Sequence, residues 1–222
     1  MSVTRYQGVL FDLDGTLVDS APDLAAAANE MRSARGLDAL PLAHFRPMVG
    51  SGARGMLARA LDIGPEHADF IELRDEYLRR YEARMTRDTV IFDGMAGVMA
   101  ALSRQGTPWG IVTNKATRFA RPLAQHLGLM AAASVLVCGD TTPHAKPHPE
   151  PLREAARRLG VDPVDCVYVG DDLRDVQAGQ AAGMATIGIA WGYLGAGAPI
   201  HEWGADHVVD TPDALLQLLG MA

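Results

Sequence analysis

Short apolar runs alternate with helical patterns along most of this chain. Five runs, each three to six residues long and bounded mainly by polar residues or glycine, are typical of strands buried on both faces: VLF at 9–11, GIVT at 110–113, SVLVC at 134–138, CVYVG at 166–170 and ATIGIA at 185–190. Helical patterns lie between the later runs, and several of them end in glycine, at 95–106, 118–129, 150–160 and 175–184. The alternation predicts an α/β fold with a doubly wound parallel sheet.

One long interval interrupts the alternation. No strand pattern stands between Leu17 and about Asp88, whereas the segments 23–37 and 66–85 are helical. Ser20 and Asp23 have the spacing of a capping box, which predicts Ser20 as the cap of the first of these helices. We therefore expect an all-helical insertion at 18–87 and a sheet-containing core formed by 1–17 and 88–222, with hinges near 17–20 and 86–92.

Polar side chains stand where the predicted strands end. Asp12 and Asp14 follow the first strand, Thr113 ends the second, Lys146 lies in the loop after the third, and Asp171 follows the fourth. Ligands of doubly wound sheets bind at this carboxyl edge of the strands. These side chains are therefore expected to form one site.

The chemistry of such a site follows from its charges. Asp12 and Asp14 point the same way in extended chain, and Asp171 adds a third carboxylate, so their repulsion calls for a hard divalent cation such as Mg²⁺. Lys146 and Thr113 supply a positive charge and a donor for phosphoryl oxygens. An aspartate can attack phosphorus, and a second carboxylate can move the proton. Phosphoryl transfer is the chemistry that this set of residues favours.

Four motifs carry a resemblance to a known family. FDLDGTL at 11–17, VTN at 112–114, Lys146-Pro147 and VGDDLRD at 169–175 resemble, in this order, the four motifs of the haloacid dehalogenase superfamily. The resemblance implies a Rossmann-like core, and an insertion after the first motif resembles the smaller, helical C1-type cap of the superfamily.

The same resemblance implies roles for the motif residues. Asp12 corresponds to the nucleophile and Asp14 to the acid and base, while Thr113, Asn114 and Lys146 correspond to the groups that bind the substrate's phosphoryl group. It further implies that Mg²⁺ is held by the Asp12 side chain, the Asp14 backbone carbonyl and the side chain of Asp171.

Three further residues have expected roles near the site. Asp175 is expected to support the metal ligands without touching the ion. Asp172 is expected to cap the following helix, and the alternative is contact with a metal-bound water. Arg54, in the segment VGSGARG at 49–55, resembles in its position the cap residue that contacts the leaving group, and arginine pairs well with carboxylate or phosphate. The segment Trp191–Tyr193 is expected to pack, with contact at the mouth of the site as the alternative.

Several reactions share this set of residues. Hydrolysis of a small phosphomonoester is favoured over a sugar phosphomutase, because Gly170 stands where such mutases of the superfamily often have glutamate. A non-enzymatic phosphoacceptor domain would have its acidic pair, acceptor, threonine and lysine in another order along the chain. A catalytically dead relative would lack the nucleophile, a metal ligand or the lysine, and this chain has all of them.

The substrate is narrowed by local resemblance. The whole chain resembles phosphoglycolate phosphatases, and SGARGM (51–56), WGIVTNK (109–115), RFARP (118–122) and WGADHVVD (203–210) resemble the N-acetylmuramic acid 6-phosphate phosphatases of peptidoglycan recycling. Both substrates carry a carboxylate and a phosphate. The sugar phosphate is the first expectation and 2-phosphoglycolate the alternative.

Composition limits the remaining possibilities. Hydrophobic residues make up 48% and charged residues 21%, which excludes an intrinsically disordered chain. A net charge of -7 argues against nucleic-acid or anionic membrane partners. The longest apolar stretch, Leu129 to Cys138, is interrupted by Ser134 and is shorter than the ~20 residues of a membrane span. With Cys138 and Cys166 expected as buried thiols, these features predict a cytoplasmic protein whose oligomeric state is open.

Overall fold

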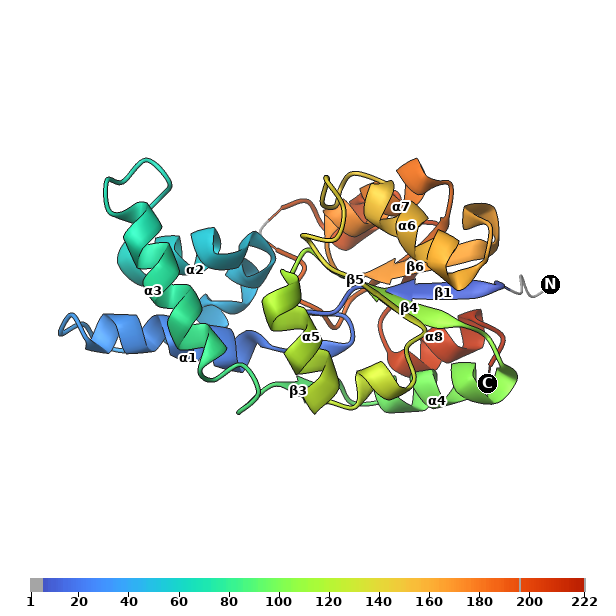
Figure 1. Ribbon diagram of the computed structural model, residues 1–222, viewed down its shortest axis with the longest axis horizontal. Helices are drawn as coiled ribbons and strands as arrows, with labels where there is room; N and C mark the ends of the chain where they lie inside the picture. The colour runs from blue at the N-terminus through green and yellow to red at the C-terminus, as the bar shows by residue number, and fades with distance from the viewer. Residues whose placement is uncertain (1–5, 196, 222) are drawn as a thin grey trace.

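A six-stranded parallel sheet forms the centre of the molecule in the computed structural model, which describes residues 6–195 and 197–221. Its strand order is β5-β4-β1-β6-β7-β8, so the first strand lies in the middle and the chain winds outward in both directions (Figure 1). The strands are β1 (Gly8–Phe11), β4 (Trp109–Val112), β5 (Val135–Val137), β6 (Cys166–Gly170), β7 (Ala185–Ile189) and β8 (His207–Val209). The predicted α/β doubly wound sheet is confirmed.

Helices cover both faces of this sheet, and alternation along β1 shows why. Val9 and Phe11 are buried against α4 (Met95–Gln105), α5 (Thr117–His126) and α8 (Pro212–Leu218). Leu10 is buried on the opposite face, against α6 (Glu150–Leu159) and α7 (Leu173–Ala182). Because both faces are apolar, each strand reads as a continuous hydrophobic run. The sheet edge at which β1, β4 and β6 end remains open for a site.

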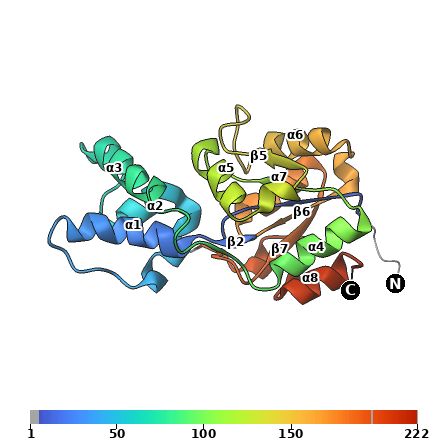
Figure 2. The same ribbon diagram turned by 60° about the horizontal axis from the view of Figure 1, so that its bottom comes forward.

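A separate helical body, inserted in the sequence after β1, lies beside the sheet-containing core (Figures 1 and 2). It holds α1 (Ala21–Ser33), α2 (Gly52–Leu61) and α3 (Phe70–Glu82), with the 3₁₀ helices η1 (Leu42–His44) and η2 (Arg46–Ser51) leading into α2. The three α-helices share their own apolar cluster, which Phe119 and Tyr193 of the core also enter. We call this body, from the start of α1 to the end of α3, the helical insertion.

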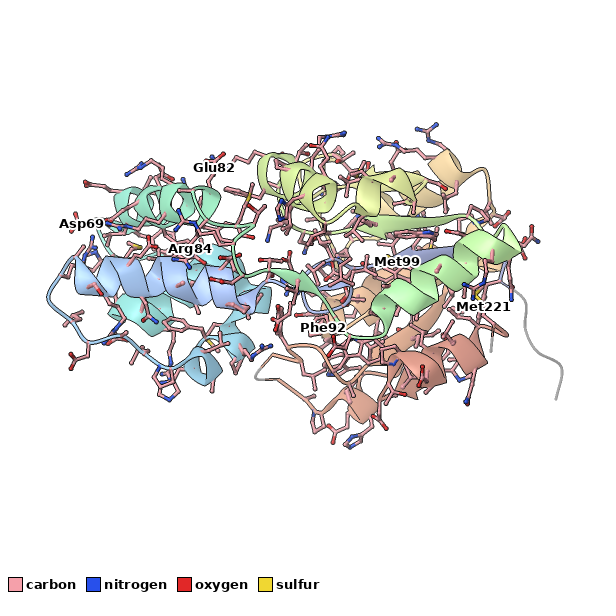
Figure 3. All side chains as sticks on the ribbon, turned by 90° about the horizontal axis from the view of Figure 1, so that it is seen from below. Asp69, Glu82, Arg84, Phe92, Met99 and Met221 are labelled. Carbon is pink, nitrogen blue, oxygen red and sulfur yellow. The ribbon has the colours of Figure 1, made fainter. Side chains whose placement is uncertain are left out.

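Two short strands join the helical insertion to the core. β2 (Val18–Asp19) and β3 (Val90–Ile91) pair antiparallel, Val18 opposite Ile91, where the chain leaves the core and returns. Figure 3 labels Phe92 at this junction and Arg84 among the insertion helices. The expectation of no strand after Leu17 is wrong at β2, because two residues are too short to give a hydrophobic period.

The start of α1 also differs from the expected capping box. The Ser20 side chain makes no capping hydrogen bond and donates to Asp14 Oδ1 of the core. Asp23 is fully buried and accepts hydrogen bonds from the backbone nitrogens of Asp88 (3.0 Å) and Thr89 (2.9 Å). Tertiary partners therefore take both side chains that the local pattern assigned to the helix end.

Three smaller findings complete the fold. Strand β8 has no counterpart among the predicted strands, because only Val209 of its three residues is buried and the segment gives little pattern. Cys138 and Cys166 are buried and form no disulfide, as expected. No helix in the described part of the chain is long and apolar enough to cross a membrane.

Candidate active site

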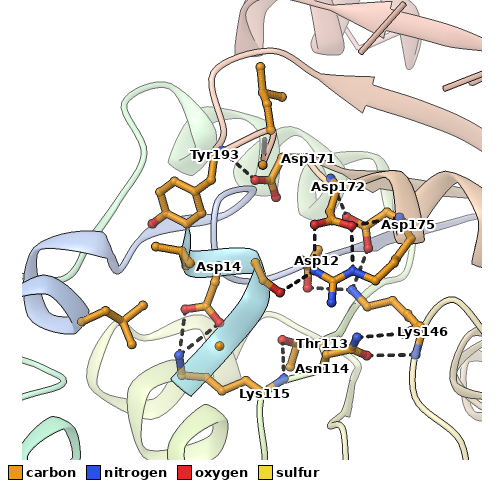
Figure 4. Close-up of a pocket in the computed structure, with 17 residues that line it drawn as sticks. Asp12, Asp14, Thr113, Asn114, Lys115, Lys146, Asp171, Asp172, Asp175 and Tyr193 are labelled. Carbon is orange, nitrogen blue, oxygen red and sulfur yellow. Dashed lines mark hydrogen bonds and ion pairs between the residues drawn. The ribbon is translucent and has the colours of Figure 1, made fainter. Parts of the chain in front are cut away.

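All the predicted site residues except Arg54 meet in one pocket at the carboxyl edge of the sheet (Figure 4). Asp12 follows β1, Thr113 follows β4 and Asp171 follows β6, while Lys146 comes from the loop after β5. The three strands are neighbours in the sheet, so their ends deliver these side chains to the same place.

Lys146 is the buried cation of the site. Its Nζ lies 2.8 Å from Asp12 Oδ1 and 2.8 Å from Asp175 Oδ1, and it also donates to the Tyr168 hydroxyl (2.7 Å) and the Val112 carbonyl (3.0 Å). Burial opposes the charge on this ammonium, but the two carboxylates outweigh burial and raise its pKa. Lys146 is therefore held charged and in a fixed place.

Asp12 has an unusual titration for a carboxyl group. Burial raises the pKa of Asp12 to about 7, although the adjacent Lys146 ammonium opposes the shift. Asp175 and Asp14 add to it by repulsion. A carboxyl in this position needs further positive charge to be fully ionised at neutral pH.

Asp171 is a buried carboxylate with close neighbours on several sides. Its oxygens accept hydrogen bonds from Thr16 Oγ1 (2.9 Å) and from the Tyr193 backbone nitrogen (2.8 Å). A side chain at Gly15, where φ is +88°, or at Gly192 would clash with the Asp171 carboxylate, so both positions need glycine. Burial and repulsion from Asp12 raise the pKa of Asp171 well above its usual value.

Three carboxylates could hold a cation. Oxygens of Asp12, Asp171 and Asp175 lie within 4.8 Å of one another, a set of hard donors that fits a small divalent ion such as Mg²⁺. Asp175 takes the third place in this cluster, whereas Asp14 contributes no side-chain oxygen to it. The assignment of Asp14 to the metal through its backbone carbonyl stays a prediction.

The Asp14 side chain has partners of its own. Lys115 Nζ lies 2.9 Å from Oδ1 and 3.1 Å from Oδ2, and the Ser20 hydroxyl donates to Oδ1. The Lys115 ammonium also stands 4.8 Å from the ring centre of Tyr81, a buried residue of the helical insertion. Asp14 is thus held in the pocket lining, on the side that faces the helical insertion.

Asp172 and Asp175 act together at the start of α7. The Asp172 side chain accepts a hydrogen bond from the Arg174 backbone nitrogen (2.9 Å), and the Asp175 side chain accepts one from the Asp172 backbone nitrogen (3.1 Å). This reciprocal pair is a capping box. The expectation that Asp172 caps this helix is confirmed, and Asp175 fixes Lys146 as well.

Asn114, Thr113 and Arg54 are placed differently from one another. Asn114 binds the backbone of Lys146 through both ends of its amide, at 2.9 Å each, so its side chain positions the lysine loop. Thr113 is buried in the pocket wall, and its hydroxyl accepts a hydrogen bond from the Lys115 backbone nitrogen (3.1 Å). Arg54 is exposed on α2 and does not line the pocket, although Gly50 and Gly52 do. Substrate contact by these three residues stays a prediction.

Two charged pocket residues, Lys115 and Arg174, had no assigned role at the sequence level. Lys115 directly follows the VTN motif and Arg174 stands within the VGDDLRD motif, so the motifs were the available signal for both. Tyr193 was expected to pack, but it also lines the pocket and its hydroxyl accepts hydrogen bonds from the backbone nitrogens of Ser20 (2.8 Å) and Ala21 (3.0 Å). Tyr193 therefore meets both expectations, because it packs in the apolar cluster of the helical insertion and also borders the pocket.

The pocket lies between the core and the helical insertion. Its cavity measures about 160 Å³. The insertion contributes the wall opposite the carboxylates, made of Leu24, Val49, Gly50 and Gly52.

Fold and site together define a class of protein, a phosphatase on a doubly wound α/β core. A family model described as haloacid dehalogenase-like hydrolase matches residues 6–183, and the chain belongs to this family.

Named relatives match the chain from end to end. The N-acetylmuramic acid 6-phosphate phosphatase of Pseudomonas putida is 41% identical over 218 residues, which cover 98% of both chains. The phosphoglycolate phosphatase of Xanthomonas campestris pv. campestris is 46% identical over 213 residues, 94% of both chains. A crystal structure titled as a predicted phosphoglycolate phosphatase from Haemophilus somnus superimposes with a TM-score of 0.85 at 27% identity, covering 98% of this chain and 99% of that chain.

Proposed function

We propose that this protein is a Mg²⁺-dependent phosphomonoester hydrolase that works through an aspartyl-phosphate on Asp12. The observation that carries the proposal is the meeting of Asp12, Lys146 and Asp171 in one buried pocket, with Lys146 Nζ 2.8 Å from Asp12 Oδ1. In this proposal Asp12 and Asp171 hold the ion with the Asp14 backbone carbonyl. The ion, when bound, supplies the positive charge that keeps Asp12 ionised and offsets phosphoryl charge.

The residues divide the reaction into two displacements. The Asp12 carboxylate attacks phosphorus, the bond from phosphorus to the ester oxygen breaks, and Asp14 gives that oxygen a proton. Asp14 then takes a proton from a water, whose oxygen attacks the same phosphorus and frees Asp12 and inorganic phosphate. Lys146, with Thr113, binds the phosphoryl oxygens throughout. In the resting protein, Asp14 Oδ1 lies 2.9 Å from Lys115 Nζ. The Asp14 carboxyl group turns away from Lys115 to reach the ester oxygen.

The helical insertion has the place of a cap in this reaction. We assign it to residues 18–87, with the core at 1–17 and 88–222, and propose that it opens to admit substrate and closes to limit water. The neck β2–β3 is where such a motion would bend the chain, because few residues connect the two bodies there.

The proposed substrate is N-acetylmuramic acid 6-phosphate, which places the protein in cytoplasmic peptidoglycan recycling. The relatives from two Pseudomonas species that bear this name, at 41% and 40% identity, support it over nearly the full length of each chain. A small phosphorylated metabolite also suits a site enclosed on two sides by core and insertion.

A second candidate, 2-phosphoglycolate, is favoured by one specific observation. The cavity of about 160 Å³ is below the ~300–1,000 Å³ of typical small-molecule pockets, so it suits a short leaving group without any movement of the insertion. Relatives with this name reach 47% identity. A phosphomutase is disfavoured, because sugar phosphomutases of the superfamily often have glutamate where this chain has Gly170. A side chain at this position would clash with the Asp175 carboxylate.

Phosphate release from the two substrates, measured side by side with Mg²⁺, tests the proposal. We expect kcat/KM for N-acetylmuramic acid 6-phosphate to exceed that for 2-phosphoglycolate by about 100-fold, a difference of roughly 2.7 kcal/mol in transition-state binding. Asp12→Asn should release no phosphate while its circular dichroism spectrum stays unchanged. A preference for 2-phosphoglycolate would reverse the choice of substrate, and an active Asp12→Asn variant would end the mechanism.

A further inference from the structure

The side chain of Arg174 is a charged part of the pocket wall that the reaction above does not use. It stands in the first turn of α7, three residues after Asp171. The Asp172 carboxylate binds it on one edge, with Nε 2.8 Å from Oδ1 and Nη2 2.7 Å from Oδ2. Because Asp172 is itself fixed as the helix cap, the guanidinium is held in place by the core.

The second edge of this guanidinium faces a different partner. Nη2 also donates to the backbone carbonyl of Gly50, in the 3₁₀ helix η2 of the helical insertion. Nη1 donates no hydrogen bond to any residue that the structure describes. A guanidinium offers two edges that can each take a carboxylate with both oxygens. The Nη1–Nη2 edge of Arg174 therefore holds a single carbonyl oxygen where two acceptor oxygens fit.

Gly50 approaches the Asp172–Arg174 pair very closely. A Cβ atom added at Gly50 would lie 2.8 Å from Asp172 Oδ2 and 3.1 Å from Arg174 Nη2. The absence of a side chain is what lets η2 come down onto the pair and narrow the cavity to about 160 Å³. The Arg174 side chain remains 38% exposed, so a ligand in the pocket can reach it.

We propose that Arg174 is a specificity-determining residue that binds the carboxylate of the substrate's leaving group. In the resting protein the Gly50 carbonyl occupies half of this subsite. The substrate carboxylate replaces that carbonyl, takes the Nη1–Nη2 edge with both oxygens, and moves η2 outward to make room for the leaving group. This inference rests on the proposed function, since it assigns a subsite within the same pocket.

Arg174 has an advantage over Arg54 for this role. Arg174 lines the pocket and is fixed by a carboxylate, whereas Arg54 is exposed on α2 and lies outside the pocket wall. A fixed guanidinium loses less freedom on binding than a mobile one, so more of its interaction appears as affinity.

Matched substrates with and without the carboxylate test this role. N-acetylglucosamine 6-phosphate is the amino sugar without the lactyl ether, and 2-hydroxyethyl phosphate replaces the carboxylate of 2-phosphoglycolate by a hydroxymethyl group. We measure kcat/KM on both pairs with Mg²⁺ for wild type, Arg174→Met and Arg153→Met. Arg153 is the control, because it also donates from Nη2 to a backbone carbonyl, that of Ala181 (2.7 Å), on the core surface at α6.

The expected result is a loss of discrimination. Arg174→Met should lower kcat/KM for the carboxylate-bearing member of the hydrolysed pair by about 10–100-fold and for its partner by less than about threefold, with the loss mainly in KM. Arg153→Met should match wild type on every substrate. Equal losses on both members of a pair, or a wild type that does not prefer the carboxylate, would overturn the role of Arg174.

Failure of the proposed function would be separately visible. If wild type hydrolyses p-nitrophenyl phosphate but neither carboxylate substrate, the substrate assignment fails. Inhibition of that reaction by N-acetylmuramic acid then decides the role of Arg174. Inhibition that is weakened about tenfold or more in Arg174→Met sustains the subsite, and inhibition that is absent or equal in both proteins removes it.

Discussion

Lys146 and Asp12 form an ion pair in the pocket, with Nζ 2.8 Å from Oδ1 and the lysine side chain only 3% exposed. The pair brings the proposed nucleophile and the proposed phosphoryl-binding cation together before any substrate arrives. Asp175, at 2.8 Å on the other side, keeps the ammonium from turning away. The electrostatic arrangement for phosphoryl transfer is thus preorganised by three side chains.

Removal of this ammonium should stop most of the turnover. We expect Lys146→Met to lower kcat by at least about 10²–10³-fold, the usual cost of losing a donor to developing negative charge. Tyr168→Phe is the milder comparison. It removes the hydroxyl that accepts a 2.7 Å hydrogen bond from Lys146 Nζ and leaves the ammonium charge in place. Steady-state kinetics with thermal melts of both variants provide the measurement. A Lys146→Met protein that folds and keeps more than about a tenth of wild-type kcat would contradict the assigned role.

Stabilisation by Mg²⁺ should depend on pH. Burial raises the pKa of Asp12 to about 7 and that of Asp171 well above its usual value. In the metal-free folded protein Asp12 holds a proton that the unfolded chain loses near pH ~4, so its contribution to the free energy of unfolding falls as pH rises through about 7. The raised pKa of Asp171 acts in the same direction. Mg²⁺ binds the ionised carboxylates and should therefore raise Tm more at about pH 8 than at about pH 5.5.

Calorimetry with and without Mg²⁺ at the two pH values checks this dependence. Asp171→Asn serves as the comparison, because it keeps the shape of the side chain and removes one of the three clustered carboxylates. Its Mg²⁺ increment should be small at both pH values. An equal increment in wild type at both pH values would show that the carboxylate cluster is not the ion's site.

The two glycines around Asp171 give a test that spares the carboxylate itself. Gly192→Ala would place a Cβ against the Asp171 side chain, and we expect it to weaken Mg²⁺ activation by about tenfold or more by displacing the carboxylate. Tyr193→Phe removes only the hydroxyl that meets the start of α1 and leaves the 2.8 Å backbone bond to Asp171. Mg²⁺ titrations of activity should separate the two variants, and identical curves would refute the packing argument.

Asp23 should matter for stability rather than for chemistry. It accepts three hydrogen bonds from Asp88 and Thr89, including 2.8 Å from the Thr89 hydroxyl, and so joins α1 to the chain returning from the helical insertion. Asp23→Ala leaves the two buried donors of Thr89 without an acceptor, which costs about 1–3 kcal/mol or more. Urea denaturation measures the change, with the exposed Asp38→Ala as control. Equal unfolding midpoints for the two variants would contradict the predicted cost.

The sequence was informative wherever a local pattern and a topological rule acted together. Buried strands read as apolar runs, and the rule that ligands bind at the carboxyl edge turned the residues after those runs into one expected site. Asp12, Thr113, Lys146 and Asp171 do lie in a common pocket. Asp172 was predicted as a cap from its neighbouring residues, and at this helix the local partners are the ones that it binds.

Contacts between distant segments were the part that no local pattern could provide. The Ser20 and Asp23 pattern is that of a capping box, yet both side chains have partners outside the helix, and the partners of Asp23 come 65 and 66 residues later. Arg174 meets Gly50 across 124 residues, and Tyr193 meets Ser20 across 173. Such pairs depend on how the helical insertion packs against the core. The periodicity of hydrophobic residues along the sequence does not encode that packing.

Chemical trapping of the covalent intermediate is the most direct test of whether Asp12 forms an aspartyl-phosphate. Wild-type protein turning over substrate with Mg²⁺ is quenched, reduced with borohydride and digested, and the peptide containing residues 9–17 is examined by mass spectrometry. We expect Asp12, and not Asp14, to be converted to homoserine, because only an acyl phosphate is reduced under these conditions. Homoserine at another aspartate, or none at all during demonstrated turnover at saturating substrate, would contradict an aspartyl-phosphate on Asp12.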